Sequence, residues 1–259
     1  MNKFTKTEGV ETMRKISRKT KIVIISIAAT LLLLLCAAAV YVGDYYRADT
    51  EAIDAYLPLE LVETRTTEDG YTAFLAKDAQ AGVIFYPGGK VEARAYAPLM
   101  AELALRGITS VLVEMPCNLA VLDMNAADGI PDEFPDIENW YMVGHSLGGS
   151  IAASYVAGHS DEMEGLILLG AYSTADLSDS GLRVMCMHGT EDGVMQRDKH
   201  DKYLANLPLD TVKIEIFGGC HAYFGMYGEQ SGDGVPTITP IEQITLTANY
   251  IADFILGGS

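Results

Sequence analysis

Cysteine is scarce in this sequence of 259 residues, and the four that are present do not suggest a disulfide framework. Cys36 lies inside a long apolar segment near the N-terminus, which leaves three, an odd number for an exported domain. Cys186 falls in an apolar stretch that is typical of a buried strand. Pairing of Cys117 with Cys220 stays open, but no other feature of the sequence supports it.

The sequence also lacks the motifs of several common classes of enzyme. None of its five histidines forms a His-x-x-x-His pair, and neither a phosphate-binding loop nor a dinucleotide fingerprint is present. Internal repeats and low-complexity runs are absent as well. We therefore expect neither a metal ion nor an organic cofactor in the functional site.

Basic residues are few beyond position 42. The whole chain has 18 Lys and Arg against 35 Asp and Glu, a net charge of −17. Seven of the basic and two of the acidic residues lie in residues 1–42, so the remainder holds 11 and 33, a net charge of −22. Such a field disfavours nucleic acid and anionic headgroups as partners. We expect no nucleic-acid partner and attribute the acidic surface to solubility.

An uncharged apolar segment, residues 22–42, follows a basic tail, residues 1–21. As a helix, this segment is about 31 Å long, which matches the roughly 30 Å hydrocarbon core of a bilayer. Because basic residues are retained on the cytoplasmic side, we predict a single-pass membrane anchor with the C-terminal domain on the extracytoplasmic side. The alternative is a signal peptide cleaved after Ala37-Ala38-Ala39, which would yield a secreted protein.

The rest of the chain is long enough for one domain. Residues 43–60 have the composition of a short stem, and residues 61–259 alternate between strand and helix patterns. Continuous apolar runs, such as residues 81–86, predict strands buried on both faces. The pattern predicts an α/β fold, a mostly parallel sheet with helices on both faces. Strands are expected at 61–64, 71–75, 81–86, 108–113, 140–143, 165–169, 184–187 and 212–217, and helices at 93–106, 124–134, 150–157, 196–207 and 241–256.

The most informative motif is Gly144-His145-Ser146-Leu147-Gly148-Gly149, which lies between an apolar run and a helix-forming stretch. It predicts a nucleophile elbow, a sharp strand-to-helix turn that presents a serine hydroxyl to substrate. The apex residue takes a positive φ, and glycines on both sides remove Cβ atoms that would collide. A glycine-rich turn without chemistry is the alternative, but acid and base candidates downstream argue against it.

Those candidates lie in two loops that each follow a buried apolar strand. Asp192 follows one strand, with the adjacent Glu191 as the alternative, and His221 follows the next. A serine nucleophile needs a histidine to take its proton and an acid to orient that histidine. The order Ser146, Asp192, His221 along the chain is the order expected downstream of an elbow. We predict these three residues as the catalytic triad.

A tetrahedral intermediate also requires two backbone N–H donors for its oxyanion. One is expected from Leu147, the residue after the nucleophile. The other is expected from the glycine-rich loop Pro87-Gly88-Gly89-Lys90, where we assign Gly89, with Lys90 as the second choice. An ordinary turn is the alternative explanation of this loop.

In these motifs and in their order along the chain, residues 60–256 resemble the α/β-hydrolase superfamily. The segments 86–91, 95–99 and 115–120 look like a bacterial subgroup of dienelactone-hydrolase-like proteins. Dienelactone hydrolases proper use a cysteine nucleophile, whereas this chain has Ser146. The resemblance implies the α/β-hydrolase fold and esterase-type chemistry without naming a substrate.

The predicted pocket is expected to have a minimal lid, because only residues 171–183 separate the strand at 165–169 from the acid-bearing strand. The long loop 223–234 either walls this pocket or lies on the surface. We predict a membrane-anchored serine hydrolase of esterase type that acts on a small or medium acyl substrate. The alternatives are an acyltransferase or a peptidase with the same triad, and a non-catalytic binding module with this fold.

Overall fold

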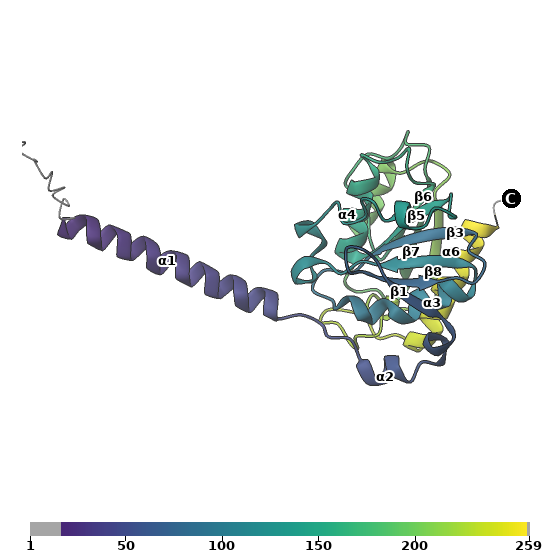
Figure 1. Cartoon of the computed structure of the whole chain (residues 1–259), viewed down its shortest axis with the longest axis horizontal. Coiled ribbons are helices and arrows are strands. Elements are labelled where there is room, and N and C mark those ends of the chain that lie inside the picture. The colour runs from purple at the N-terminus through teal and green to yellow at the C-terminus, as the bar shows by residue number, and fades with distance from the viewer. Residues whose placement is uncertain (1–16, 258–259) are drawn as a thin grey trace, which may run out of the picture. The chain divides into compact units, whose positions relative to one another are not determined.

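The computed structural model describes residues 17–257, and the chain divides into two units, Met1–Gly43 and Asp44–Ser259. The described part of the first unit is one helix, α1 (Arg18–Gly43) (Figure 1). Its length and apolar composition suffice to cross a membrane, and a signal sequence has the same properties. Most of the predicted basic tail, residues 1–16, lies outside the described residues.

The second unit is built on an eight-stranded sheet in the order β1-β2-β4-β3-β5-β6-β7-β8. Its first three strands pair antiparallel, and all later pairs are parallel. The strands from β3 to β7 are apolar and buried almost throughout, as expected of strands covered on both faces. The bounds are β1 (Glu63–Thr66), β2 (Thr72–Leu75), β3 (Ala81–Tyr86), β4 (Ile108–Leu112), β5 (Trp140–His145), β6 (Gly165–Leu169), β7 (Arg183–Gly189) and β8 (Val212–Ile216).

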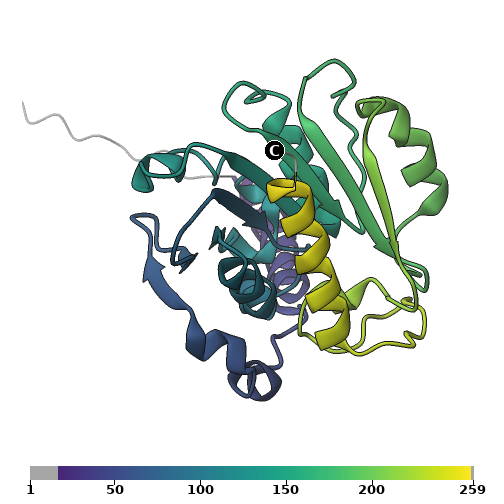
Figure 2. The same ribbon diagram turned by 90° about the vertical axis from the view of Figure 1, so that its right-hand side faces the viewer.

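Helices cover both faces of this sheet. Along β3, Val83 and Phe85 belong to the core formed with α3 (Ala97–Leu105) and α6 (Pro240–Leu256). The alternate residues Ile84 and Tyr86 belong to the core formed with α4 (Ser146–Val156). This alternation follows from the two-residue period of a strand. Figure 2 shows α6 lying across one face of the sheet. The predicted α/β fold is confirmed.

The order of the strands brings two pairs of loops to the same edge of the sheet, those after β3 and β5 and those after β7 and β8. Tyr86, the last residue of β3, pairs with Gly144 near the end of β5, so the loop after β3 emerges beside the elbow. In the same way, β7 and β8 are parallel neighbours and end together at the pair Gly189 and Ile216. The carboxyl ends of parallel strands are where ligands bind in open α/β sheets.

Two expectations need correction. The segment predicted as a stem packs on the domain, where it forms α2 (Thr50–Asp54) and buries Ile53 and Tyr56 at 1 % and 7 % exposure. The helix predicted at 124–134 is absent, and turns with a single 3-10 turn at Pro131–Glu133 replace it. Gly129 adopts a φ of 76°, outside the helical range, and Pro131 two residues later cannot donate a helical hydrogen bond.

The connection from β6 to β7, residues 170–182, contains no helix. This agrees with the predicted minimal lid. The last predicted helix is present as α6, where Thr239 and Glu242 form a capping box and Pro240 occupies the first turn. The helix expected at 196–207 is present as the shorter α5 (Arg197–Tyr203), followed by a 3-10 turn.

Candidate active site

Ser146 occupies the turn between β5 and α4 with a φ of 52°, in the left-handed region that residues other than glycine rarely adopt. The flanking glycines are required by contact. A Cβ on Gly144 would lie 2.6 Å from the backbone of Gly149, and one on Gly148 would lie 2.1 Å from the carbonyl oxygen of Pro87. The local geometry is therefore that of a nucleophile elbow.

Asp192 and His221 form a buried pair beyond the ends of β7 and β8. Their Oδ2 and Nδ1 atoms are 2.8 Å apart, and the residues are 5 % and 1 % exposed. The other carboxylate oxygen accepts backbone N–H bonds from Val194 and Met195 at 3.0 and 2.8 Å. Glu191, the alternative acid, accepts a hydrogen bond from the hydroxyl of Thr190 instead.

These hydrogen bonds affect the pKa of Asp192. Burial by itself raises the pKa of Asp192, but the bond to His221 and the two backbone N–H bonds outweigh it, and the pKa lies below its usual value. The carboxylate is thus ionised at neutral pH and accepts the Nδ1–H of His221. In a neutral imidazole with Nδ1 protonated, Nε2 is an acceptor.

The Nε2 atom of His221 is buried and has no hydrogen-bond partner among residues 17–257. His221 and Ser146 line the same cavity, of about 260 Å³, together with apolar side chains that include Ala171, Val194 and Met195. The structure thus brings Ser146 and the Asp192–His221 pair to one pocket. An unpartnered ring nitrogen on a residue that lines the same cavity as a serine suits a general base.

The loop after β3 leaves one N–H group for a ligand. The N–H of Gly88 donates to the Tyr96 hydroxyl at 3.1 Å, and that of Lys90 donates to the carbonyl oxygen of Asn118 at 2.7 Å. Between them, the N–H of Gly89 has no acceptor in the described part of the chain. Gly89 also packs against Leu147, since a Cβ there would lie 2.7 Å from the Leu147 side chain. This arrangement favours Gly89 over Lys90 as the second oxyanion donor.

Backbone strain accompanies this loop. Lys90 has a φ of 60°, and Cys117 and Asn118, which follow β4, both have a φ of 55°. With Ser146, these are the non-glycine residues of positive φ in the part of the chain that the structure describes. All four follow the carboxyl ends of β3, β4 and β5, where strain of this kind commonly marks a functional site.

Tyr96 and His145 support the loop after β3, and the sequence did not reveal this contact. The Tyr96 hydroxyl accepts from Gly88 and lies 2.7 Å from Nδ1 of His145, so its proton is directed to that nitrogen. Burial, followed by the proximity of His221, holds the pKa of His145 well below its ordinary value, which keeps the ring neutral and able to accept. The two histidine rings lie 4.5 Å apart.

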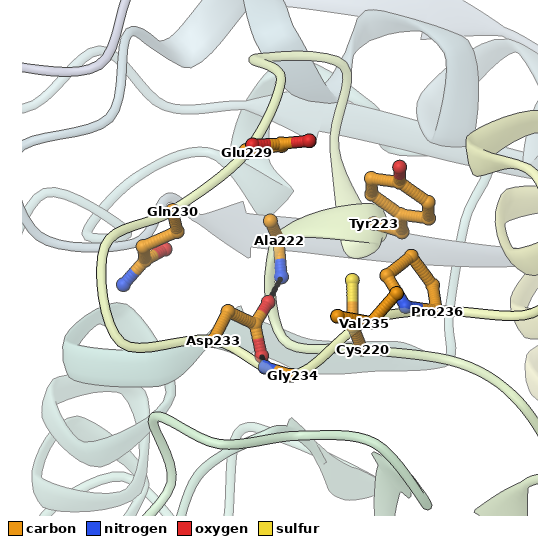
Figure 3. Close-up of a pocket in the computed structure, with 9 residues that line it drawn as sticks. All are labelled: Cys220, Ala222, Tyr223, Glu229, Gln230, Asp233, Gly234, Val235 and Pro236. Atoms are coloured by element: carbon orange, nitrogen blue, oxygen red, sulfur yellow. Dashed lines mark hydrogen bonds between the residues drawn. The ribbon is translucent and has the colours of Figure 1, made fainter.

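Asp233 is a further residue that the sequence did not single out. Its carboxylate accepts backbone N–H bonds from Gly193, His221, Ala222 and Gly234 at 3.0, 3.2, 2.8 and 2.9 Å. Figure 3 shows Asp233 directed at Ala222 and Gly234. One carboxylate therefore joins the loop that carries Asp192 to the loop that carries His221.

The loop at 223–234 lines a different cavity from the one beside Ser146. Tyr223, Glu229 and Asp233 contribute to a cavity of about 140 Å³ next to Cys220 (Figure 3). None of the loop residues lines the cavity of Ser146 and His221. In this structure the loop is therefore bonded, through Asp233, to the loops that carry Asp192 and His221, and it does not line the cavity of Ser146.

All four cysteines are free, Cys117 is exposed, and burial raises the thiol pKa of both Cys186 and Cys220 to about 12. A buried thiol with such a pKa is a poor nucleophile at neutral pH. Among residues 17–257, no group of three or more His, Cys, Asp and Glu side chains could hold a metal ion.

Comparison with known proteins identifies the family. Residues 82–245 match the model of the Alpha/beta hydrolase family, so the chain belongs to this family. A search of curated proteins by sequence found no match.

Solved structures with similar folds include three hydrolases. Est1E from Butyrivibrio proteoclasticus is 14 % identical with a TM-score of 0.53, and the alignment covers 75 % of this chain and 98 % of Est1E. Dienelactone hydrolase from Anabaena variabilis is 13 % identical with a TM-score of 0.55, covering 76 % and 98 %. A monoglyceride lipase from Saccharomyces cerevisiae is 13 % identical with a TM-score of 0.52, covering 75 % and 94 %. At this level of identity the similarity establishes the fold.

Proposed function

We propose that this protein is a membrane-anchored serine hydrolase of esterase type, which cleaves a small or medium acyl substrate through an acyl-enzyme intermediate. Ser146 is the nucleophile, His221 the general base and Asp192 the acid that orients it. Leu147 and Gly89 donate to the oxyanion. We further propose that α1 is an uncleaved anchor that leaves the catalytic domain on the extracytoplasmic side.

One observation carries the catalytic part of this proposal. Ser146 sits at a strained elbow and lines a cavity together with His221, whose Nδ1 is bound to an ionised, buried Asp192. Each of the three groups has the environment that its role requires. Nε2 of His145 is also buried without a partner in the described residues, but His221, and not His145, lines the cavity of Ser146.

The proposed reaction has two steps, acylation of Ser146 and hydrolysis of the acyl-enzyme. First, His221 Nε2 takes the Ser146 hydroxyl proton while Oγ bonds to the acyl carbon, and the carbonyl oxygen becomes an oxyanion held by two N–H donors. The carbon–oxygen bond to the alcohol then breaks, and His221 returns the proton to the departing alcohol. In the second step, His221 takes a proton from water while the water oxygen bonds to the acyl carbon. The bond from that carbon to Oγ then breaks, His221 returns the proton to Oγ, and the carboxylic acid leaves.

Active-site labelling tests this function. Full-length protein in detergent is incubated with a fluorophosphonate probe and with p-nitrophenyl esters of increasing chain length. We expect labelling and turnover in the wild type, and loss of both in Ser146→Ala. Ser154→Ala is a matched control, because its hydroxyl bonds to the carbonyl oxygen of Ser150 within α4, and it should keep both signals. A wild type that neither labels nor hydrolyses any ester would contradict the proposal.

Two further measurements separate the alternatives. Faster transfer of the acyl group to an added alcohol than to water would indicate an acyltransferase, and faster cleavage of amides than of esters would indicate a peptidase.

N-terminal sequencing of the mature protein tests the anchor. A mature chain that begins at Val40 would show a cleaved signal peptide.

A further inference from the structure

The first residues after α1 are bound directly to the oxyanion loop. The carboxylate of Asp44 pairs with Nζ of Lys90 at 3.0 Å. The N–H of Tyr46 donates to the carbonyl oxygen of Lys90 at 2.8 Å, and the N–H of Glu92 donates to that of Tyr46 at 3.0 Å, which makes Tyr46 a short parallel bridge to Val91. Asp44 and Tyr46 are therefore part of the folded domain and are bonded to the loop that contains Gly89.

The same short segment reaches the loop that follows His221. The N–H of Asp49 donates to the carbonyl oxygen of Met226 at 2.9 Å, and the N–H of Ser231 donates to the Tyr46 hydroxyl at 3.2 Å. The Tyr46 ring also packs on Tyr227, with centroids 5.7 Å apart. Residues 44–49, which we call the docked tether, thus hold both the oxyanion loop and the base-bearing loop.

Chain length limits how far this edge can lie from a membrane that α1 enters. Two residues, Asp44 and Tyr45, lie between Gly43 and Tyr46. The three Cα–Cα steps that join Gly43 to Tyr46 span about 11 Å at most in a fully extended chain. The polar headgroup layer on each side of a bilayer is roughly 5–8 Å thick. The ester bonds of membrane lipids lie in that layer, and a chain of this length is long enough for Tyr46 and the loop bonded to it to reach the layer, and too short for them to extend far beyond it.

A second observation concerns the turn after β4, on the same edge of the sheet. Val121, Leu122 and Met124, which we call the apolar turn, are 56 %, 57 % and 40 % exposed. The 3-10 turn Ala120–Leu122 contacts α4, the helix that begins with Ser146. Exposed apolar side chains gathered at one place commonly mark a surface that meets lipid or another protein. The docked tether identifies the partner as the bilayer that holds α1.

We propose that the substrate of this site is an ester-bearing amphiphile resident in the same membrane as α1, which the enzyme reaches at the headgroup layer. This inference rests on the proposed function and adds the substrate class to it. The domain has a net charge of −22, so attraction to anionic lipids does not bring it to the surface, and the tether does. The preferred substrate is accordingly neutral or zwitterionic.

The test compares an embedded ester with a soluble one. Full-length protein is reconstituted in phosphatidylcholine vesicles that contain 4-methylumbelliferyl oleate, and turnover of p-nitrophenyl acetate is measured in parallel. A spacer of ten Gly and Ser residues is inserted between Gly43 and Asp44, which adds about 17 Å of mean reach. We expect turnover of the embedded ester to fall at least fivefold and turnover of the soluble ester to stay within twofold.

The matched control inserts the same spacer between Asp69 and Gly70, in the exposed turn that joins β1 and β2, and should change neither rate. The double substitution Val121→Ser and Leu122→Ser should also lower only the turnover of the embedded ester. Equal embedded-ester rates with and without the spacer at Gly43 would overturn the inference while leaving the proposed function intact. A wild type that cleaves neither ester would overturn both.

Discussion

At the residue scale, the proposed chemistry depends on Asp192 accepting the Nδ1–H of His221. Asp192→Asn places an amide where the carboxylate was, and this favours the wrong tautomer of His221. We expect kcat to fall by about 10³–10⁴-fold with the fold intact, by analogy with other serine triads. Glu191→Gln is the control and should stay within twofold, whereas a larger loss there than in Asp192→Asn would transfer the role of the acid to Glu191.

His145 makes the stability of the domain sensitive to acid. Its folded pKa lies well below 6.5, so below about pH 6.5 the unfolded chain binds a proton that the native state does not. Stability is therefore full above that pH and falls as pH decreases, by up to about 1.4 kcal/mol per pH unit for one group. The pKa of buried Asp192 is also lowered, so its contribution to the stability of the folded state is likewise lost as pH decreases, in a lower pH range.

Thermal unfolding midpoints measured from pH 8 to pH 5 test this effect. We expect a decrease below pH 6.5 that becomes shallower in His145→Gln. His159→Gln is the control, since its side chain is partly exposed and lies away from the site, and it should leave the slope unchanged. A slope that is the same in wild type and His145→Gln would contradict the assignment.

At the element scale, Asp233 joins the loops after β7 and β8, so its removal should affect catalysis more than binding. Asp233→Ala leaves the N–H groups of Gly193, His221 and Ala222 without their acceptor. We expect kcat to fall by about 10–100-fold with KM within twofold, because misplacement of a catalytic group by about 1 Å can cost 10²-fold. Asp233→Asn keeps one acceptor oxygen and should recover part of the loss.

Glu229→Gln, on the same loop, is the control for Asp233 and should leave kcat unchanged. The Nδ1–H proton of His221 gives a second readout, a downfield NMR signal that should broaden in Asp233→Ala. If kcat fell only in proportion to the loss of folded protein at the assay temperature, with the NMR signal unchanged, the role of Asp233 would be purely structural.

Features that depend on short stretches of sequence were predictable at this scale. Buried apolar runs indicated the strands, and the family match confirms the α/β-hydrolase fold. Ser146, Asp192 and His221 each follow such a run, so a local pattern sufficed to propose them. In the structure, Ser146 and His221 line one pocket and Asp192 is bonded to His221. Their catalytic roles remain predictions.

Features that depend on distant contacts were not predictable. Tyr96 and Asp233 form hydrogen bonds with residues far along the chain or with backbone groups, and such contacts cannot be predicted from the local sequence. The burial of Ile53 likewise depends on the core that α3 and the sheet provide, and composition alone suggested a stem. The missing helix at 124–134 shows the converse, because Gly129 and Pro131 outweigh a run of helix-compatible residues.

At the scale of the whole molecule, the folded unit that contains Ser146 begins at Asp44. A chain that starts at Asp44 should fold with the stability of the full domain, whereas one that starts at Leu61 loses Ile53 and Tyr56 from the core. Each of these side chains contributes about 1.5–3 kcal/mol by burial, so we expect the second chain to be several kcal/mol less stable. Urea denaturation of both chains measures the difference. Equal midpoints would show that residues 44–60 contribute nothing to the fold.

The concentration of left-handed residues near Ser146 has a consequence for directed evolution. Lys90, Cys117, Asn118 and Ser146 each hold a backbone conformation that costs on the order of 1 kcal/mol or more. Selection for heat resistance would thus readily enrich glycine at these positions. Since the fourth is the proposed nucleophile and the first three shape the loops beside it, such a screen would recover durable but inactive variants unless turnover were selected at the same time.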